Sequence, residues 1–189
     1  MEIKKTLIVG LAGVTLIAGA TGCKKDEKKV EEKNNAIVEK ISNLATNGDQ
    51  KEFEGMMVIN FQTLRSHTGV SEEDAEVALG QLPTEVDSTF YLAIKPKSGK
   101  SKFGNTYKER VKELVGNYID SLKQRISGEL PMATGEDEEI SDEEKARRAE
   151  IQKKVDMLNN MKIEEYKGYI IYVSSSDNAK VLSEIKKGL

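Results

Sequence analysis

Hydrophobic positions between residues 107 and 126 recur every three or four residues, which is the spacing of one face of an amphipathic helix. This stripe consists of Val111, Leu114, Val115, Tyr118, Ile119, Leu122 and Ile126. Thr106 and Glu109 have the spacing of a capping box at its start, and Gly128 follows its end. The sequence therefore predicts a helix over about 107–127.

A second hydrophobic pattern, with period two, predicts strands. Phe90, Leu92 and Ile94 are separated by single residues, which indicates a strand over about 90–95. Residues 161–166 and 169–173 predict a hairpin whose turn is Lys167-Gly168. Residues 53–67 fit either a strand or the start of a buried helix.

Four further helices are predicted from apolar spacing and from residues that commonly cap helices. They cover about 37–48, 71–80 beginning at Ser71, 142–158 beginning at Ser141, and a final segment that begins at Ser176. This order of elements predicts an α+β fold in which amphipathic helices pack on a small antiparallel sheet. The length fits one domain, placed at 36–189.

The first 22 residues have the pattern of an export signal. Lys4 and Lys5 precede a stretch from Thr6 to Gly22 without a charged residue, which is short for a membrane-spanning helix. The stretch ends in Ala20-Thr21-Gly22-Cys23, which resembles the lipobox of bacterial lipoproteins, although Ala20 stands where that family usually has Leu. The alternative is an ordinary secretory signal with a cysteine at its end.

The lipobox resemblance implies that 1–22 is a signal peptide removed by cleavage. It also implies that the Cys23 sulfur carries a diacylglycerol, that the new amino group is often acylated with a fatty acid such as palmitate, and that the protein lies on the extracytoplasmic face of the cell membrane. Residues 24–35 hold nine charges in twelve positions, which predicts a solvated, flexible linker. Cleavage removes Glu2, Lys4 and Lys5 and leaves 31 acidic and 27 basic residues, a net charge of −4.

Composition excludes several classes of function. The chain has one Cys and one His, which excludes an intramolecular disulfide framework, a cysteine zinc ribbon and a His-rich metal site. A net charge of −3 argues against a general nucleic-acid binder. We predict no metal and no cofactor.

The segment from residue 95 to 112 is the strongest candidate for a charged binding surface. It contains seven bases and one acid, Glu109. Anionic wall polymers or lipid headgroups would be attracted to such a patch, and the alternative is a solvated loop and helix start. The residues proposed to contact an anionic polymer are Lys95, Lys97, Lys100, Lys102 and Arg110.

The run Lys97-Ser98-Gly99-Lys100-Ser101 falls between a strand and a helix, as a phosphate-binding loop does. It lacks the earlier glycine that this loop requires, which argues against nucleotide binding. The acidic residues of segment 129–144 could attract calcium, but the order of an EF-hand is missing. We therefore predict an acidic loop there.

His67 and the tyrosines of the hairpin are weaker candidates. His67 has no second imidazole to act with, so a position at the surface or at a helix end is expected. Tyr166, Tyr169 and Tyr172 could form an aromatic surface for sugars or peptides. Strand parity places Tyr169 with Ile171 and Tyr172 with Ile170, which favours core and rim positions.

The carboxyl-terminal half, from Leu82 to Leu189, resembles small lipoproteins of low-GC Gram-positive bacteria that carry a domain of unknown function. The resemblance lies in Ala93-Ile94-Lys95, in the charged helix that follows, and in 166–174. Segment 129–144 is an insertion relative to that pattern. The resemblance implies no activity and no site residues.

No catalytic constellation is visible in the sequence, and we predict that the protein is not an enzyme. The leading hypothesis is a membrane-anchored binding or scaffolding domain whose partner is an envelope protein or an anionic wall polymer. The alternatives are a lipoprotein that captures a small ligand for a transporter, and a cell-wall hydrolase, which would need paired carboxylates in a cleft.

Overall fold

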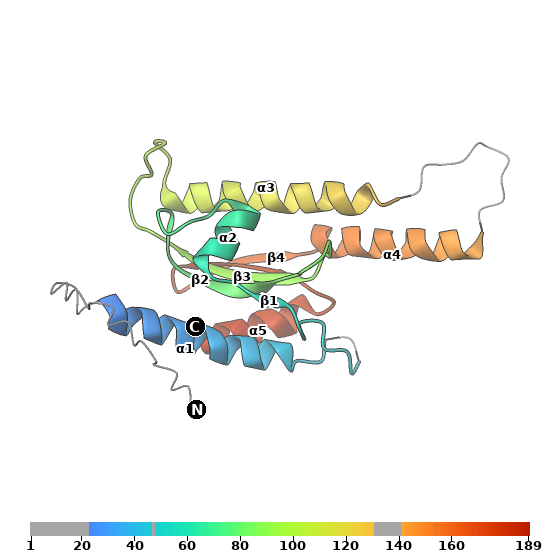
Figure 1. The fold of residues 1–189 in the computed structure, drawn as a ribbon, viewed down its shortest axis with the longest axis horizontal. Coiled ribbons are helices and arrows are strands. Elements are labelled where there is room, and N and C mark those ends of the chain that lie inside the picture. The colour runs from blue at the N-terminus through green and yellow to red at the C-terminus, as the bar shows by residue number, and fades with distance from the viewer. Residues whose placement is uncertain (1–22, 47, 131–140) are drawn as a thin grey trace, which may run out of the picture.

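The computed structural model describes residues 23–46, 48–130 and 141–189, and the side chains from Glu32 onward within them (Figure 1). The predicted signal peptide, the side chain of Cys23 and most of the acidic segment 129–144 lie outside this description. No helix in the described ranges is both long and apolar enough to cross a membrane. The elements are α1 (Cys23–Ser42), β1 (Met57–Val58), α2 (Phe61–Thr68), β2 (Ala75–Leu82), β3 (Phe90–Pro96), α3 (Tyr107–Ser127), α4 (Asp142–Asn159), β4 (Lys162–Tyr166), β5 (Tyr169–Ser174) and α5 (Asn178–Gly188).

The strands form one antiparallel sheet in the order β1-β2-β3-β5-β4. The central strand β3 pairs Leu92 with Gly80 of β2 and with Tyr172 of β5. Helices α1 and α5 cover one face of the sheet, and α2 and α3 cover the other (Figure 1). The predicted α+β class with a small antiparallel sheet is confirmed.

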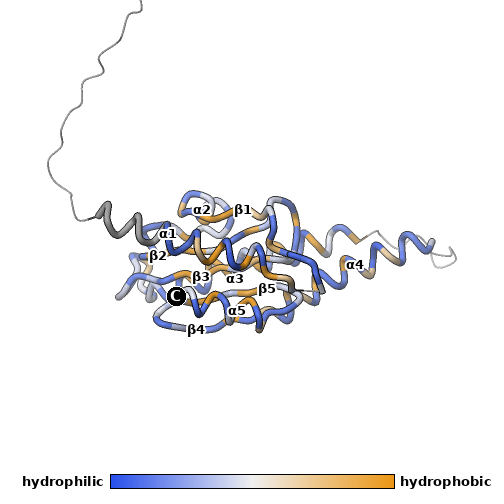
Figure 2. The backbone as a smooth tube through the Cα atoms, turned by 90° about the horizontal axis from the view of Figure 1, so that it is seen from below, coloured by the Kyte–Doolittle hydropathy of each residue, from blue (hydrophilic) through white to orange (hydrophobic). Residues whose placement is uncertain are grey.

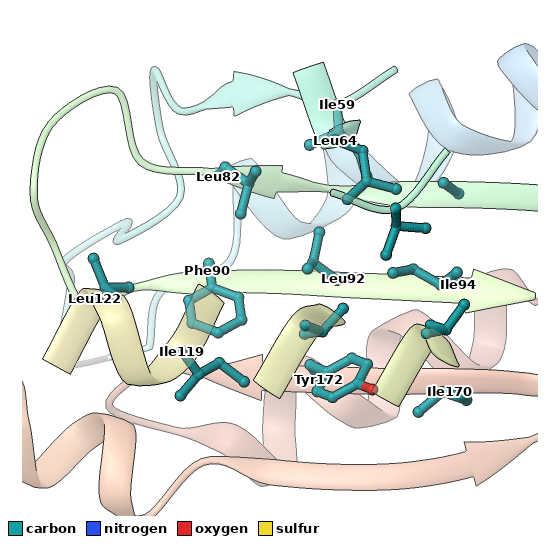
Figure 3. Packing of buried hydrophobic residues seen from close by; sticks show 14 of the residues in the cluster. Ile59, Leu64, Leu82, Phe90, Leu92, Ile94, Ile119, Leu122, Ile170 and Tyr172 are labelled. Atoms are coloured by element: carbon teal, nitrogen blue, oxygen red, sulfur yellow. The ribbon is translucent and has the colours of Figure 1, made fainter. Parts of the chain in front are cut away.

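Strand alternation divides the interior into two cores. On the α3 side, Phe90, Leu92 and Ile94 pack with the apolar stripe of α3 (Figure 3). On the other side, Tyr91 and Ala93 pack with residues of α1 and α5. Because helices cover both faces of β3, its residues from Phe90 to Ile94 are buried.

Helix α3 forms as the sequence predicts. The Thr106 hydroxyl accepts a hydrogen bond from the Glu109 amide at 3.2 Å, and the Glu109 carboxylate accepts one from the Thr106 amide at 2.8 Å. Helix α4 begins after Ser141, as predicted, and buries Ile151 and Leu158. The amino-terminal end of α4 projects beyond the sheet (Figure 2).

The predicted helix over 71–80 is wrong, because this segment forms a turn followed by β2. The side chain of Asp74 accepts hydrogen bonds from the Ser71 amide and hydroxyl, which closes the turn. Gly80 has a φ of +155°, and a Cβ at this position would lie 2.3 Å from the Tyr91 carbonyl oxygen. The apolar positions of β2 fit a helix equally well because helices cover both faces of the sheet, so the strand shows no polar alternation.

The amino-terminal segment also differs from the prediction. The backbone is helical from Cys23, and α1 ends at Ser42 rather than near Gly48. Asn34 is buried, and Lys33 Nζ donates a hydrogen bond to the Leu189 carbonyl oxygen at 2.9 Å. Contacts with the rest of the domain therefore extend to Lys33 and Asn34. Lysine and glutamate favour helices, so a charged segment that is too polar for a core still becomes helical next to the packed half of α1.

Two smaller differences concern element ends. Helix α5 is capped by Asp177, whose side chain accepts from the Lys180 amide, and not by Ser176. The ambiguous segment 53–67 contains both β1 and α2. The predicted hairpin is confirmed: Lys167 and Gly168 have φ values of 48° and 82°, as a type I′ turn requires.

Candidate functional site

A groove of about 760 Å³ lies beside the amino-terminal end of α3. We call it the loop–helix groove. Its walls are α2, the turn 71–74, the loop 97–106 and the first turn of α3. Its lining residues are Phe61, Gln62, Arg65, Ser66, Gly69, Ser71, Glu72, Glu73, Lys102, Phe103 and Arg110.

Phe103 stands at the rim of this groove and is 61% exposed. The Arg110 guanidinium lies 4.2 Å from the centroid of its ring, and Lys102 Nζ lies 5.5 Å from it. The loop is held by its own hydrogen bonds, from the Ser101 hydroxyl to the Asn105 side chain at 2.6 Å and from the Phe103 amide to the Ser101 hydroxyl at 3.2 Å. A large apolar ring is thus held in water by an ordered loop.

Arg110 is fixed by a nearly buried ion pair. Its Nε donates to Asp74 Oδ1 at 2.6 Å, and the Asp74 side chain is 5% exposed. Burial raises the pKa of Asp74, but the hydrogen bonds from Arg110 and Ser71 outweigh it and hold this pKa below its usual value. The hydrogen bond from Lys102 likewise lowers the pKa of Glu73. Carboxylates with lowered pKa values suit ion pairing and not proton donation near neutral pH.

The basic segment predicted from the sequence is largely neutralised in the fold. Five of its seven bases pair with acids from other elements: Lys95 with Glu76, Lys102 with Glu73, Lys108 and Lys112 with Glu165, and Arg110 with Asp74. Lys97 and Lys100 have no such ion pair within the described part of the chain. The five proposed polymer-contact residues therefore do not form one positive surface, and their binding of an anionic polymer remains a prediction.

A smaller hollow of about 270 Å³ lies between the end of β3 and the β4–β5 turn. It is lined in part by Lys97, Lys108, Glu165, Tyr166 and Lys167. Hydrogen bonds from Lys108 and Lys112 lower the pKa of Glu165 to about 2. Glu165 thus ties edge strand β4 to α3.

A third hollow, of about 300 Å³, lies where the loops before and after β1–β2 meet. Its charged lining residues are all acidic: Glu52, Glu54, Glu85 and Asp87. Asp87 also pairs with Lys154 at 3.4 Å.

The remaining sequence candidates lie mainly in structural positions. Tyr169 and Tyr172 are buried on opposite faces of the sheet, as parity predicts. His67 is exposed in the last turn of α2. In the ranges that the structure describes, no three His, Cys, Asp or Glu residues are grouped as a metal site would require.

Sequence reasoning missed Phe103 and its partners from α2 and the turn 71–74. One signal was present, because Phe103 is the single apolar residue in the polar loop 97–106. Its neighbours Glu73 and Asp74 come from a segment that was predicted to be a helix. Comparison with known protein families, with curated proteins and with solved structures gave no match for this chain.

Proposed function

We propose that this protein is a lipid-anchored domain of the extracytoplasmic membrane face that binds another envelope component through the loop–helix groove. The observation that carries the anchor is the position of the sole cysteine. Cys23 follows directly on an uncharged stretch with a basic start, which is where lipoprotein processing takes place. Two or more acyl chains give stable membrane attachment.

The described backbone supports a close connection between anchor and domain. Helix α1 begins at Cys23, and its second half buries Ile37 and Ile41 against the sheet. The ten residues from Cys23 to Lys33 extend about 15 Å along a helix. The anchor would hold the domain near the bilayer through a helix.

The groove supports recognition of a protein segment more than of a polyanion. It exposes an aromatic ring and side chains of both charges, and its Lys102–Glu73 and Arg110–Asp74 pairs already neutralise two of its cations. A peptide that carries apolar and charged groups would match this surface, whereas a uniformly anionic polymer would meet Glu72 and Glu73.

The anchor is tested with Cys23→Ala in the producing cell. Membranes are washed in high salt, which removes proteins held by surface charge alone. We expect the wild-type chain to remain in the washed membranes and Cys23→Ala to move to the soluble fraction. Retention in washed membranes of a Cys23→Ala chain that has lost residues 1–22 contradicts lipid anchoring.

The groove is tested by placing a photo-crosslinking residue at Gln62, which lines it, and as a control at Gln124, an exposed position farther along α3. We expect one discrete adduct from Gln62 and none of the same mass from Gln124. Arg65→Glu should abolish the adduct, while Arg125→Glu should leave it. Equal adducts from both positions would contradict binding in the groove.

Small-ligand capture is a second candidate function, since 760 Å³ falls within the usual range of small-molecule sites. A thermal-shift panel of metabolites separates the two. A shift caused by one class of compound and abolished by Arg65→Glu favours ligand capture. If no compound shifts the melting temperature, ligand capture is rejected.

A further inference from the structure

The described domain has a lysine-rich loop at one end of its long axis and a hollow with acidic lining residues toward the other. Strand β3 joins the loop 83–89 to the loop 97–106, and its seven residues separate these loops by about 20 Å. Loop 97–106, the β4–β5 turn and the start of α1 lie at the same end of the molecule (Figure 1). We call this the anchor end, because Cys23 is on that side.

Contacts between elements independently tie the anchor end together. Lys33 of α1 lies with its Nζ 5.9 Å from the centroid of the Tyr169 ring, directly after the β4–β5 turn. The β4–β5 turn and the loop after β3 both line the smaller hollow, to which they contribute Lys167 and Lys97. The helix that leads to Cys23 and the basic loop therefore lie at the same end of the sheet, on opposite faces of it (Figure 1).

The anchor end holds three lysines without an ion pair. Lys97, Lys100 and Lys167 pair with no carboxylate in the described ranges, although Lys100 contributes to the lowered pKa of Glu109. Loop 97–106 has no acidic residue. Phe103, the most exposed large apolar side chain described, lies on the same loop.

A hollow with acidic lining residues lies toward the opposite end of the domain. The loops there form the hollow lined by Glu52, Glu54, Glu85 and Asp87, with Lys154 as the partner of Asp87. The whole chain has a net charge of −3, so total charge does not attract it to an anionic surface. An approach with the anchor end first turns Lys97, Lys100 and Lys167 toward such a surface and the acidic hollow away from it.

We propose that the anchor end rests on the anionic lipid surface, with Lys97, Lys100 and Lys167 at the headgroups and Phe103 in the interfacial layer. The proposal rests on the lipid anchor of the proposed function, which places the domain next to the membrane. The contact between these side chains and the lipids needs no acyl chain. Helix α1 separates Cys23 from Lys33 by about 15 Å. When α1 and the domain packed on it tilt together relative to the bilayer, loop 97–106 reaches the headgroups.

The exposed ring distinguishes a lipid surface from other anions. Lysine side chains are attracted to anionic headgroups, and aromatic rings favour the membrane–water interface. A wall polymer presents negative charge but no apolar layer, so it would use the lysines and leave Phe103 in water. On the membrane, the loop–helix groove opens next to the bilayer and the acidic hollow faces away.

The test uses the mature chain, which begins at residue 23, with Cys23→Ser, so that binding depends neither on acylation nor on the apolar segment 6–22. The chain contains no tryptophan, so Phe103→Trp supplies a single reporter, and Leu130→Trp just past the other end of α3 is the matched control. Vesicles contain either phosphatidylcholine alone or phosphatidylcholine and phosphatidylglycerol in equal parts. Acyl chains labelled with bromine quench a tryptophan that enters the interface.

We expect the fluorescence of the Phe103→Trp variant to shift to the blue and to be quenched by bromine with the mixed vesicles, and to do neither with pure phosphatidylcholine. The fluorescence of the Leu130→Trp variant should stay unchanged with both kinds of vesicle. Unchanged fluorescence of the Phe103→Trp variant while it co-sediments with the mixed vesicles overturns the proposed orientation. Binding of soluble polyglycerol phosphate with the same affinity as the mixed vesicles, without a blue shift, would assign the surface to a wall polymer instead.

The lysines are tested with Lys97→Gln, Lys100→Gln and Lys167→Gln combined. Each lysine near an anionic surface contributes roughly fivefold to binding, so partition to mixed vesicles should fall roughly 100-fold. The control removes the same charge elsewhere, with Lys51→Gln, Lys123→Gln and Lys153→Gln. Equal losses of partition to mixed vesicles in the two triple variants refute the proposal. That outcome does not bear on lipid anchoring, which is tested separately by the fractionation of Cys23→Ala.

Discussion

The ion pair between Arg110 and Asp74 allows a quantitative test of how the groove is held together. Asp74 accepts three hydrogen bonds, from Arg110 Nε at 2.6 Å, from the Ser71 amide at 3.1 Å and from the Ser71 hydroxyl at 3.0 Å. Its side chain is 5% exposed and that of Arg110 is 22% exposed. The perturbation is Asp74→Asn, which keeps the shape and removes the charge.

The expected loss follows from the hydrogen bonds and the unpaired cation. Removing one partner of a buried ion pair costs about 3–5 kcal/mol, and we take the lower part of this range, about 3 kcal/mol, because Arg110 retains contact with water. Asparagine keeps one acceptor oxygen for Ser71, so about 2 kcal/mol is the lowest loss we expect.

The pH dependence gives this prediction its sign. The pKa of Asp74 is lower in the folded protein than its usual value of 3.8. A lowered pKa stabilises the folded state above the unfolded-state value, and this stabilisation is lost as the pH falls through the folded-state pKa. The difference in unfolding free energy between wild type and Asp74→Asn should therefore be full at pH 7 and shrink below about pH 4.

The assay is urea denaturation of both proteins over this pH range. Glu109 and Glu165 also have lowered pKa values, but they are present in both proteins, so their contributions cancel in the difference. The charge of Asp74 raises the pKa of Glu73, so both proteins are compared in a Glu73→Gln background. A difference that stays constant from pH 7 to below pH 4 would refute a charge-based role for Asp74. A difference below about 0.5 kcal/mol at pH 7 would refute the pairing itself.

Three other substitutions test particular parts of the fold. Gly80→Ala should lower the unfolding free energy by about 3 kcal/mol, because the added Cβ would lie 2.3 Å from the Tyr91 carbonyl oxygen. Gly99→Ala has open space around it and should cost about 1 kcal/mol of backbone strain. Equal losses of the two variants in denaturant titrations would contradict the register of β2 on β3. Thr106→Ala should cost about 1 kcal/mol by the same measurement, because it removes the cap of α3, and an unchanged midpoint would count against that cap. Phe103→Ser should change the melting temperature by very little because the ring is mostly in water, and a large drop would mean that the loop depends on the ring for stability.

Local patterns sufficed for the elements whose signals are local. The capping box of α3 and its long apolar stripe are contained in one segment, and the hairpin turn is specified by Lys167-Gly168. Strand β2 could not be recognised, because a strand covered on both faces has no alternation and its Ala75, Ala78 and Leu79 also fit helical spacing.

The site was harder to predict, since its chemistry depends on distant pairs. The lysines and arginine of 95–112 are obvious in the sequence, but the carboxylates that neutralise them lie 29 to 57 residues away in the cases of Lys102 and Lys108. From the sequence alone, a run of basic residues predicts a positively charged surface. With the fold known, two of the seven bases of this segment, Lys97 and Lys100, have no ion pair among the described residues, and both lie on the same loop as the exposed ring of Phe103.

The identity of residue 23 in the mature protein tests the central claim most directly. Intact-mass measurement of the protein purified from its own membranes should give a chain that starts at Cys23 and carries the added mass of a diacylglycerol, with or without a further acyl group. A chain that retains residues 1–22, or one that begins at Cys23 with a free thiol, would contradict lipid anchoring.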